Sequence, residues 1–492
     1  METHVPINEA NVRLIFGLKL KQLRLDKGLS QSEMAKRTDI SVSYLNEIEK
    51  GKKFPKPEKI AQLADSLSVS YDWLVSLQLS KNLAPIGELL KSPILNELPL
   101  DVFGIDRSQL FDLLSSAPVK LNAFINTLIE IGRNYGMRVE HFYFSALRSF
   151  QELHENYFEE IEQAVDKATQ EFAITRPVIS AQLVQILQEH YHYQIDEEGL
   201  SAQPELQGLR SVILPGKKPR LLLNKQLSDT QRGFILAREL GFQYMGITDR
   251  SYTTSWVEVS NFEQVLNNFK GSYFACALFL EKDALVEEIK ACMQEKNVSV
   301  EALRAIMQKN QVSPEMLMHR LTNLLPRNFG ISELFFLRFS NTVGTQHFEL
   351  TKEMHLSGLH NPHTNMLNEH YCRRWVAIHI LQNLKGDETE PLIKLQRSKY
   401  IGSEREYLII SMAQPALKGG KVNNSVSIGL LLTDSLKKKV KFWNDPSIPI
   451  RMVGETCERC MATDCQERVE KPLQIIRQQR IENMKMALKG LS

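Results

Sequence analysis

The chain has 492 residues, a formal net charge of +2, 43% hydrophobic and 24% charged residues, and six cysteines. The length predicts about three domains, and a net charge near zero means that nucleic-acid binding has to be argued from local patterns. No apolar run reaches the ~18 residues of a membrane span, and residues 1–14 lack the basic and apolar regions of a secretory signal. We therefore expect a cytoplasmic protein without a membrane partner.

Residues 1–79 predict an all-α N-terminal domain of short helices. Apolar residues recur at helical spacing and alternate with capping signals; the expected helices span 12–27, 31–38, 42–51, 57–67 and 70–77. Gly28 ends the first helix, and Ser30 with Glu33 forms a capping box for the second. Ser41 caps the third helix. Short helices joined by tight turns are typical of the helix-turn-helix motif.

The segment LKQLRLDKGLSQSEMAKRTDISVSYLNEIEKGKKFPKPEKIAQLADSLSVSYDWL resembles the Cro/repressor (XRE-type) helix-turn-helix family. Its landmarks are Gln31 at the start of the second helix, Ala35 at the turn, and residues 48–51 at the end of the third. The alternative is a small helical bundle whose lysines are simply solvated.

The resemblance implies that the third helix enters the major groove of double-stranded DNA with its N-terminal residues at base edges. The base-edge candidates are Ser41, Val42, Ser43 and Asn46, with Tyr44 nearby. The phosphate candidates are Arg24, Gln31, Lys50, Lys52 and Lys53. Because such a domain covers few base pairs, we expect a homodimer or higher homo-oligomer on a pseudo-palindromic operator.

Residues 80–175 predict a helical connector or dimerisation region. Prolines punctuate residues 80–120, a helix pair is expected over 121–150, and residues 141–172 form a strongly amphipathic helical pattern. The segment 121–173 is expected to set the spacing of two DNA-binding domains in a dimer. A spacer that packs on the next domain is the alternative.

Residues 176–325 predict an α+β domain, with a helix over 177–193, strands within 211–224 and a helix starting at Ser228. This order, together with residues 312–324, resembles the ImmA/IrrE family of zinc peptidase-like domains.

That family carries the sequence FxLAHELGH on the helix that holds zinc, with two histidines as metal ligands and a glutamate as general base. In this chain Arg238 and Phe242 stand at the two histidine positions and Asn268 at that of the acidic third ligand; Glu239 remains. Arginine and phenylalanine cannot replace imidazole on zinc. We therefore expect no enzyme activity. The alternative is a metalloprotease-like stress regulator with a DNA-binding head.

Residues 326–492 predict an α+β ligand-sensing domain. Strands are expected at 332–340, 344–351, 405–415 and 423–433, and helices at 368–384 and 472–491. The spacing Cys457-x2-Cys460-x4-Cys465 suits three ligands of one structural zinc ion. Cys372 is the candidate fourth ligand, with His370 or His379 as substitutes. An iron–sulfur cluster and free thiols are the alternatives.

This order of domains, with residues 372–375 (CRRW) early and 457–465 late in the last one, resembles the short-chain fatty acyl-CoA regulators. The resemblance implies a transcriptional regulator whose effector is a small ligand such as a short-chain acyl-CoA. No glycine-rich phosphate loop is present. Basic residues such as Arg397, Lys399 and Arg405 are the candidates for holding the CoA phosphates, and solvated surface charge is their alternative role.

Overall fold

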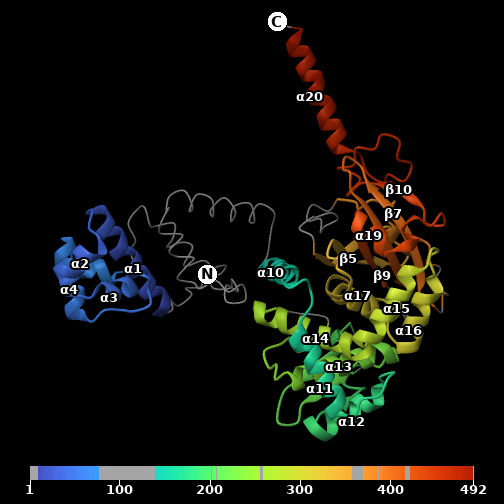
Figure 1. The fold of residues 1–492 in the computed structure, drawn as a ribbon, viewed down its shortest axis with the longest axis horizontal. Helices are drawn as coiled ribbons and strands as arrows, with labels where there is room; N and C mark the ends of the chain where they lie inside the picture. Colours follow the sequence, from blue (N-terminus) through green and yellow to red (C-terminus); the bar gives the residue numbers. More distant parts are fainter. Residues whose placement is uncertain are drawn as a thin grey trace. The chain divides into compact units, whose positions relative to one another are not determined.

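The structure is a computed structural model that describes residues 9–76 and 139–490, apart from 201, 207, 255–258, 357–368, 385–387, 389 and 416–421. The chain divides into two units, Met1–Tyr143 and Phe144–Ser492 (Figure 1). Most of the expected connector, and the expected helices within 77–138, lie outside the described residues. No helix in the described part is long and apolar enough to cross a membrane.

The first unit contains the helices expected for residues 1–79. They are α1 (Glu9–Asp26), α2 (Gln31–Thr38), α3 (Val42–Glu49), α4 (Pro57–Leu67) and α5 (Tyr71–Val75). Ser30 and Glu33 form the expected capping box, and Ser41 caps α3 by accepting a hydrogen bond from the Tyr44 backbone. Buried side chains from these helices, among them Met34 and Leu45, form one shared core.

Helices α1 and α3 cross at Gly17. A Cβ atom at this position would lie 2.3 Å from the carbonyl oxygen of Ile48 and 2.8 Å from that of Glu49. Only glycine permits such a close approach of two backbones. The crossing fixes α3 on the surface of the bundle.

The second unit begins with helices and a small sheet. Its first elements are α10 (Val139–Leu153), which starts at the end of the first unit, α11 (Glu159–Glu171), α12 (Ser180–Tyr191), β1 (Gln194–Asp196), η2 (Pro204–Leu206), β2 (Ser211–Leu214), β3 (Arg220–Leu223), α13 (Asp229–Tyr244), β4 (Thr253–Thr254), α14 (Phe262–Phe279), α15 (Lys282–Gln294), α16 (Val300–Asn310) and α17 (Pro314–Phe329). The sheet order is β1-β3-β2-β4. Helix α13 packs against α12 and α14, and α14 also contacts α11 and α17.

The continuous helical pattern expected over 141–172 is wrong in one respect, because the helix breaks between α10 and α11. Glu155 and Asn156 have φ values of 50° and 53°. Asn156 is buried, and its side-chain amide donates to Thr322 at 2.9 Å, while its carbonyl oxygen accepts from Asn323 at 2.9 Å. These contacts to α17 favour the break, and asparagine tolerates the left-handed conformation more readily than most residues.

The C-terminal part is built on a sheet of order β10-β7-β8-β9-β5-β6, in which only β10 and β7 pair in parallel. The remaining elements are β5 (Leu334–Thr342), β6 (Phe348–His355), α18 (Val376–Gln382), β7 (Leu392–Tyr400), β8 (Glu406–Gln414), β9 (Val422–Leu431), α19 (Asp434–Lys439), η3 (Lys441–Asn444), β10 (Ile450–Val453) and α20 (Leu473–Lys489). The strands expected from the sequence are present; β7 and β10 were missed.

The two faces of this sheet are covered by different helices. Side chains that alternate along β5 and β8, such as Phe335 and Ile409, pack with α18 in one core. On β8 the next residue, Ile410, belongs to the opposite face and lines a cavity beside α15 and α17. Helix α17 crosses the domain boundary expected at 325/326 and packs on β5, β8 and β9.

Candidate nucleic-acid interface and the cysteine segment

The N-terminal end of α3 is the exposed part of that helix. Ser41, Val42 and Ser43 are exposed, while Tyr44 and Asn46 are half-buried. Leu45 and Ile48 point into the core and are fully buried. The helix is therefore held firmly by one side and presents a short polar surface at its beginning, which is the geometry that reading base edges requires.

Arg24 does not fit the phosphate contact expected for it. The side chain is buried, its Nε donates to Glu49 Oε1 at 2.6 Å, its Nη2 to Glu49 Oε2 at 3.0 Å and its Nη1 to the Leu29 carbonyl at 2.8 Å. Glu49 is 4% exposed. A buried guanidinium held by a carboxylate in this bidentate manner orders the protein's interior and is not available to DNA.

Gln31 joins the same network from α2. Its amide nitrogen donates to Glu49 Oε2 at 2.9 Å and lies 3.5 Å from Asn46 Oδ1. Gln31 and Asn46 are both half-buried, so each keeps part of its amide accessible. The structure brings these two candidates together. Sequence reasoning missed Glu49, although its place beside Ile48 at the buried end of α3 could have indicated it.

The basic candidates lie in the turn after α3. Lys52 and Lys53 are exposed and Lys50 is half-buried. Lys53 pairs with Glu47 at 2.8 Å, and this partner raises the pKa of the Lys53 amine. Lys36 and Arg37, exposed in the last turn of α2, are further cations of this unit that the sequence reasoning did not single out.

The peptidase-like positions in the second unit are buried. Arg238 and Phe242 lie inside the protein, and Phe242 stacks under the Arg250 guanidinium at 4.3 Å. Glu239, at the general-base position, accepts two hydrogen bonds of 2.7 Å from Arg250. Asn268 is also buried. Both carboxylate oxygens of Glu239 are thus occupied by the Arg250 guanidinium.

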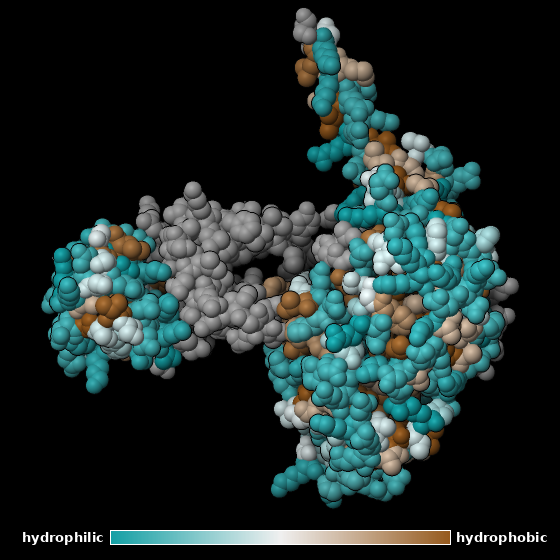
Figure 2. Space-filling view, in the orientation of Figure 1, coloured by the Kyte–Doolittle hydropathy of each residue, from teal (hydrophilic) through white to brown (hydrophobic). Residues whose placement is uncertain are grey.

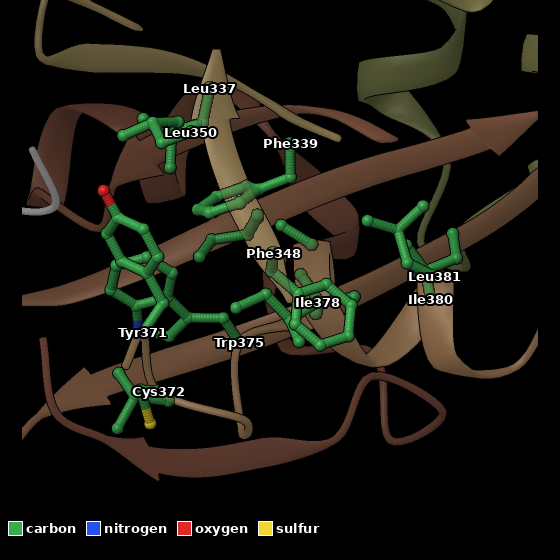
Figure 3. Close-up of a cluster of buried hydrophobic side chains, with 14 of the residues drawn as sticks. Leu337, Phe339, Phe348, Leu350, Tyr371, Cys372, Trp375, Ile378, Ile380 and Leu381 are labelled. Carbon is green, nitrogen blue, oxygen red and sulfur yellow. The ribbon is translucent and has the colours of Figure 1, made fainter. Parts of the chain in front are cut away.

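The cysteine segment is attached to the start of α18. The helix expected over 368–384 begins only at Val376, because Tyr371 forms a β-bridge with Thr456 and the Cys372 backbone donates to the Glu455 carbonyl at 3.0 Å. Trp375 Nε1 donates to the Gly454 carbonyl at 2.8 Å. Figure 3 shows Cys372 next to Tyr371 and Trp375, at one end of the cluster of buried side chains.

Three of the four predicted metal ligands share this neighbourhood. Cys372, Cys457 and Cys460 are buried, while Cys465 is half-buried. Burial raises the pKa of the Cys372 thiol to about 11, and the nearby Cys460 and Cys457 act in the same direction. The Arg468 guanidinium fixes the loop by donating to the Cys457 carbonyl at 2.6 Å.

The substitute ligands are engaged with other groups. His370 lies beside the cysteines, since its carbonyl accepts from the Cys457 backbone at 2.7 Å. His370 Nδ1 faces Glu458 Oε1 at 2.8 Å, and His379 has Lys394, Arg451 and Glu467 as its charged neighbours. Among the residues that the structure describes, no group of three or more histidine, cysteine, aspartate or glutamate side chains lies so that it could hold a metal ion. As they lie, the four cysteines therefore do not form a metal centre.

Arg397, a candidate for holding CoA phosphates, is already engaged. It is buried, its Nε donates to Glu406 at 2.7 Å and its Nη1 to Asn444 at 2.6 Å. Lys399 lies 3.9 Å from the same carboxylate. Arg397 is thus neither free for a phosphate nor a solvated surface charge.

Comparison with known proteins finds a matching family model in the first unit. Residues 20–74 match the helix-turn-helix family. The chain is 35% identical over 66 residues to the HTH-type transcriptional regulator y4dJ of Sinorhizobium fredii, covering 13% of this chain and 86% of that protein. It is 42% identical over 60 residues to the HTH-type transcriptional regulator YazB of Bacillus subtilis, covering 12% and 87%.

The control protein C.BamHI of Bacillus amyloliquefaciens is 35% identical over 60 residues, which cover 12% of this chain and 74% of that protein. Among solved structures, a Mycobacterium tuberculosis transcriptional regulator is similar over 66% of this chain and 92% of its own, with 18% identity and a TM-score of 0.46. A likeness at this level carries no argument about the second unit.

Proposed function

Because this chain belongs to the helix-turn-helix transcriptional regulators and binds DNA through its first unit, we propose that α3 reads a specific operator and that a small ligand held in the second unit controls this reading. The observation that carries the proposal is the exposed N-terminal end of α3. Ser43 is exposed and Asn46 half-buried at this end, and Lys52 is exposed after the helix; in the proposal Ser43 and Asn46 contact base edges and Lys52 a phosphate.

One substitution in α3 and one in the turn after it distinguish base reading from phosphate contact. We expect Asn46→Ala to weaken binding to a selected operator by roughly 10- to 100-fold, with little change on random duplex, because one base contact contributes ~1–3 kcal/mol. Lys52→Ala is expected to weaken both complexes equally and to reduce their salt dependence. Gel-shift titrations at several salt concentrations measure these effects.

The control is Lys217→Ala, which removes an exposed lysine from the second unit. It should bind like the wild type. If Asn46→Ala bound operator and random duplex as the unaltered chain does, α3 would not be the reading helix.

The ligand part of the proposal is supported by an apolar cavity in the second unit. Its volume is about 50 Å³, and it lies between α15, α17, η3 and the sheet. The lining includes Met293, Leu321, Ile428 and Phe442. Since one water molecule needs ~10–15 Å³ on the same measure, this volume suits a chain of a few carbon atoms. A short acyl group, such as that of a short-chain acyl-CoA, is the effector class that we propose.

A cavity-filling variant tests the effector. We expect a short-chain acyl-CoA to raise the unfolding temperature of the full chain, since a ligand that binds the native state stabilises it. Val298→Phe, at the half-buried rim of the cavity, should abolish this rise, and Val298→Ala should retain it. An equal rise in both variants would locate the ligand elsewhere.

We further propose that the four cysteines can close around a structural zinc ion. Metal binding can drive such closure, because zinc displaces the thiol protons and its binding energy adds to folding. We expect one zinc per chain, lost in Cys457→Ser and kept in Cys292→Ser, by elemental analysis that also counts iron. Zinc retained in Cys457→Ser, or iron in place of zinc, would refute this assignment.

We also propose that the protein acts as a homodimer on two half-sites. The segment 121–173 would set the distance between the two heads. What supports a fixed distance is that α11, its last helix, is held in the second unit by the buried ion pair of Glu162 with Arg320.

A further inference from the structure

Arg238 carries a buried charge without a direct carboxylate partner. The side chain is 5% exposed, its Nη2 donates to Thr254 Oγ1 at 2.5 Å, and its Nε has no hydrogen-bond partner within the described residues. The nearest carboxylate, Glu239, is taken by Arg250, whose two nitrogens lie 2.7 Å from its oxygens. Arg238 therefore has no hydrogen bond or ion pair to a carboxylate, and the charge of Glu239 that acts on it is shared with Arg250.

The charge of a second arginine, Arg210, also acts on Arg238. The Arg210 backbone donates to the Thr254 carbonyl at 2.5 Å, so strand residue Thr254 connects the two arginines. Arg210 is half-buried and forms no ion pair with any residue of the described ranges. Burial is the main cause that lowers the pKa of both guanidinium groups. The charges of Glu315 near Arg210 and of Glu239 near Arg238 oppose this shift, and neighbouring arginines add to it.

The surroundings of Arg238 contain another polar group without a partner. Asn268 is 3% exposed, and neither its Nδ2 nor its Oδ1 has a hydrogen-bond partner in the part of the chain described. It lies on α14 one turn before Gly271, where an added Cβ would come within 3.0 Å of Arg238 Cγ. Asn268 and Gly271 therefore share the face of α14 that packs toward Arg238.

Two positive charges and an unsatisfied amide in a protein interior are costly unless something binds them. Removing an ionised group from water without a counter-charge costs several kcal/mol of free energy. A guanidinium presents a planar fork of N–H donors that matches a carboxylate or a phosphate. The half-buried position of Arg210 is where such a group can enter from solvent.

We propose that Arg238 and Arg210 bind the oxyanion group, a carboxylate or a phosphate, of a small ligand, with Thr254 between them. Of these residues only Arg238 stands where the ImmA/IrrE sequence pattern has a histidine that binds metal. This site is separate from the apolar cavity and does not depend on how α3 reads DNA.

Thermal unfolding of the full chain tests the site. Inorganic phosphate and acetate are added separately, each against chloride at the same ionic strength. We expect at least one of them to raise the unfolding temperature of the second unit by roughly 2–4 °C, and the comparison identifies the preferred group. Arg210→Gln, a change at a half-buried position, should remove this rise.

Arg238→Met and Arg250→Met form a matched pair, because both arginines are 5% exposed in the same region. Without added anion, Arg238→Met should leave the unfolding temperature unchanged or raise it, since an unpaired buried charge is removed. Arg250→Met should lower it, since Glu239 loses its partner. Arg238→Met should also lose the response to the anion.

Three results would overturn the proposal. The first is that neither anion exceeds chloride in the wild-type chain. The second is an equal anion response in Arg210→Gln and the wild type. The third is that Arg238→Met is destabilised as strongly as Arg250→Met, which would mean that Arg238 already has its counter-charge in the protein.

Discussion

Lys19 and Arg24 are basic residues of α1 that are both buried inside the first unit. The Lys19 amine donates to the Ser76 carbonyl at 2.9 Å and lies 4.2 Å from the centre of the Trp73 ring. Lys19 thus ties the first helix to the last one of the bundle. Both residues fix helices of the bundle to one another, Lys19 through α5 and Arg24 through Glu49 of α3.

The burial of Lys19 has a consequence for pH dependence. Burial lowers the pKa of its amine from 10.5 to about 8. Between these two values the unfolded chain holds a proton that the folded chain lacks, so the contribution of Lys19 to stability should rise as pH increases from 8 to 10.5. The stability that Lys19 contributes above pH 10.5 should be lost as pH falls from 10.5 to about 8.

Nuclear magnetic resonance of 13C-labelled lysine measures this titration directly. We expect one lysine signal to titrate near pH 8 and to be absent in Lys19→Met. If every lysine signal titrated near 10.5, the amine would be solvated and its place in the bundle would be different.

At the residue scale, the sequence predicts those contacts that residues make with others close to them along the chain. The capping box of Ser30 and Glu33 follows from their spacing and is present. Arg24 could not be assigned in this way. Its partner Glu49 stands 25 positions later in the chain, and nothing local distinguishes an arginine that contacts phosphate from one that holds a buried carboxylate.

At the scale of elements, the packing of α13 on α14 depends on glycine. A Cβ at Gly271 would lie 2.4 Å from Phe242 Cε1, and one at Gly241 would lie 2.7 Å from Phe274. Each helix thus receives an aromatic ring of the other at a position without a side chain. The pair of helices holds Arg238 and Asn268 in place.

We expect Gly271→Ala to destabilise the second unit by about 1–3 kcal/mol, because an added methyl group overpacks a filled contact. Denaturant unfolding gives the change. Gly216→Ala is the control, since nothing lies within 4 Å of a Cβ at that position. Equal stability of the two variants would argue against the close contact of α13 and α14.

The elements that the sequence predicted best are those whose pattern is local. Strands β5, β8 and β9 follow their apolar runs, and α13 begins at the Ser228 cap as expected. The break between α10 and α11 was not predictable from periodicity. It rests on the contacts of Asn156 with Thr322 and Asn323, which lie more than 160 positions away.

At the scale of the molecule, expected domain boundaries are crossed by packing. Glu162, in the segment expected to be a connector, pairs with Arg320 of α17 at 2.5 Å, and both side chains are buried. Helix α17 in turn packs on the C-terminal sheet. The second unit therefore joins residues 159–171, 314–329 and the C-terminal sheet by packing, across the domain boundaries expected from the sequence.

The C-terminal helix α20 differs from the other long helices, because it has no buried residue. Its exposed apolar side chains stand among polar ones along the helix in Figure 2; they are Leu473, Ile476, Ile481, Met484, Met486 and Leu488. The helix expected over 472–491 is present here. Its apolar side has no partner within the part of the chain that the structure describes.

The central claim is that the first unit reads DNA sequence, and selection from a random pool of duplexes with the full-length chain tests it most directly. We predict one enriched motif with two half-sites centred about 10 base pairs apart or a multiple of this. The selected duplex should bind at least ~1,000-fold more tightly than the starting pool at physiological salt. A pool that stays random after repeated selection, with every duplex bound equally, would contradict the claim.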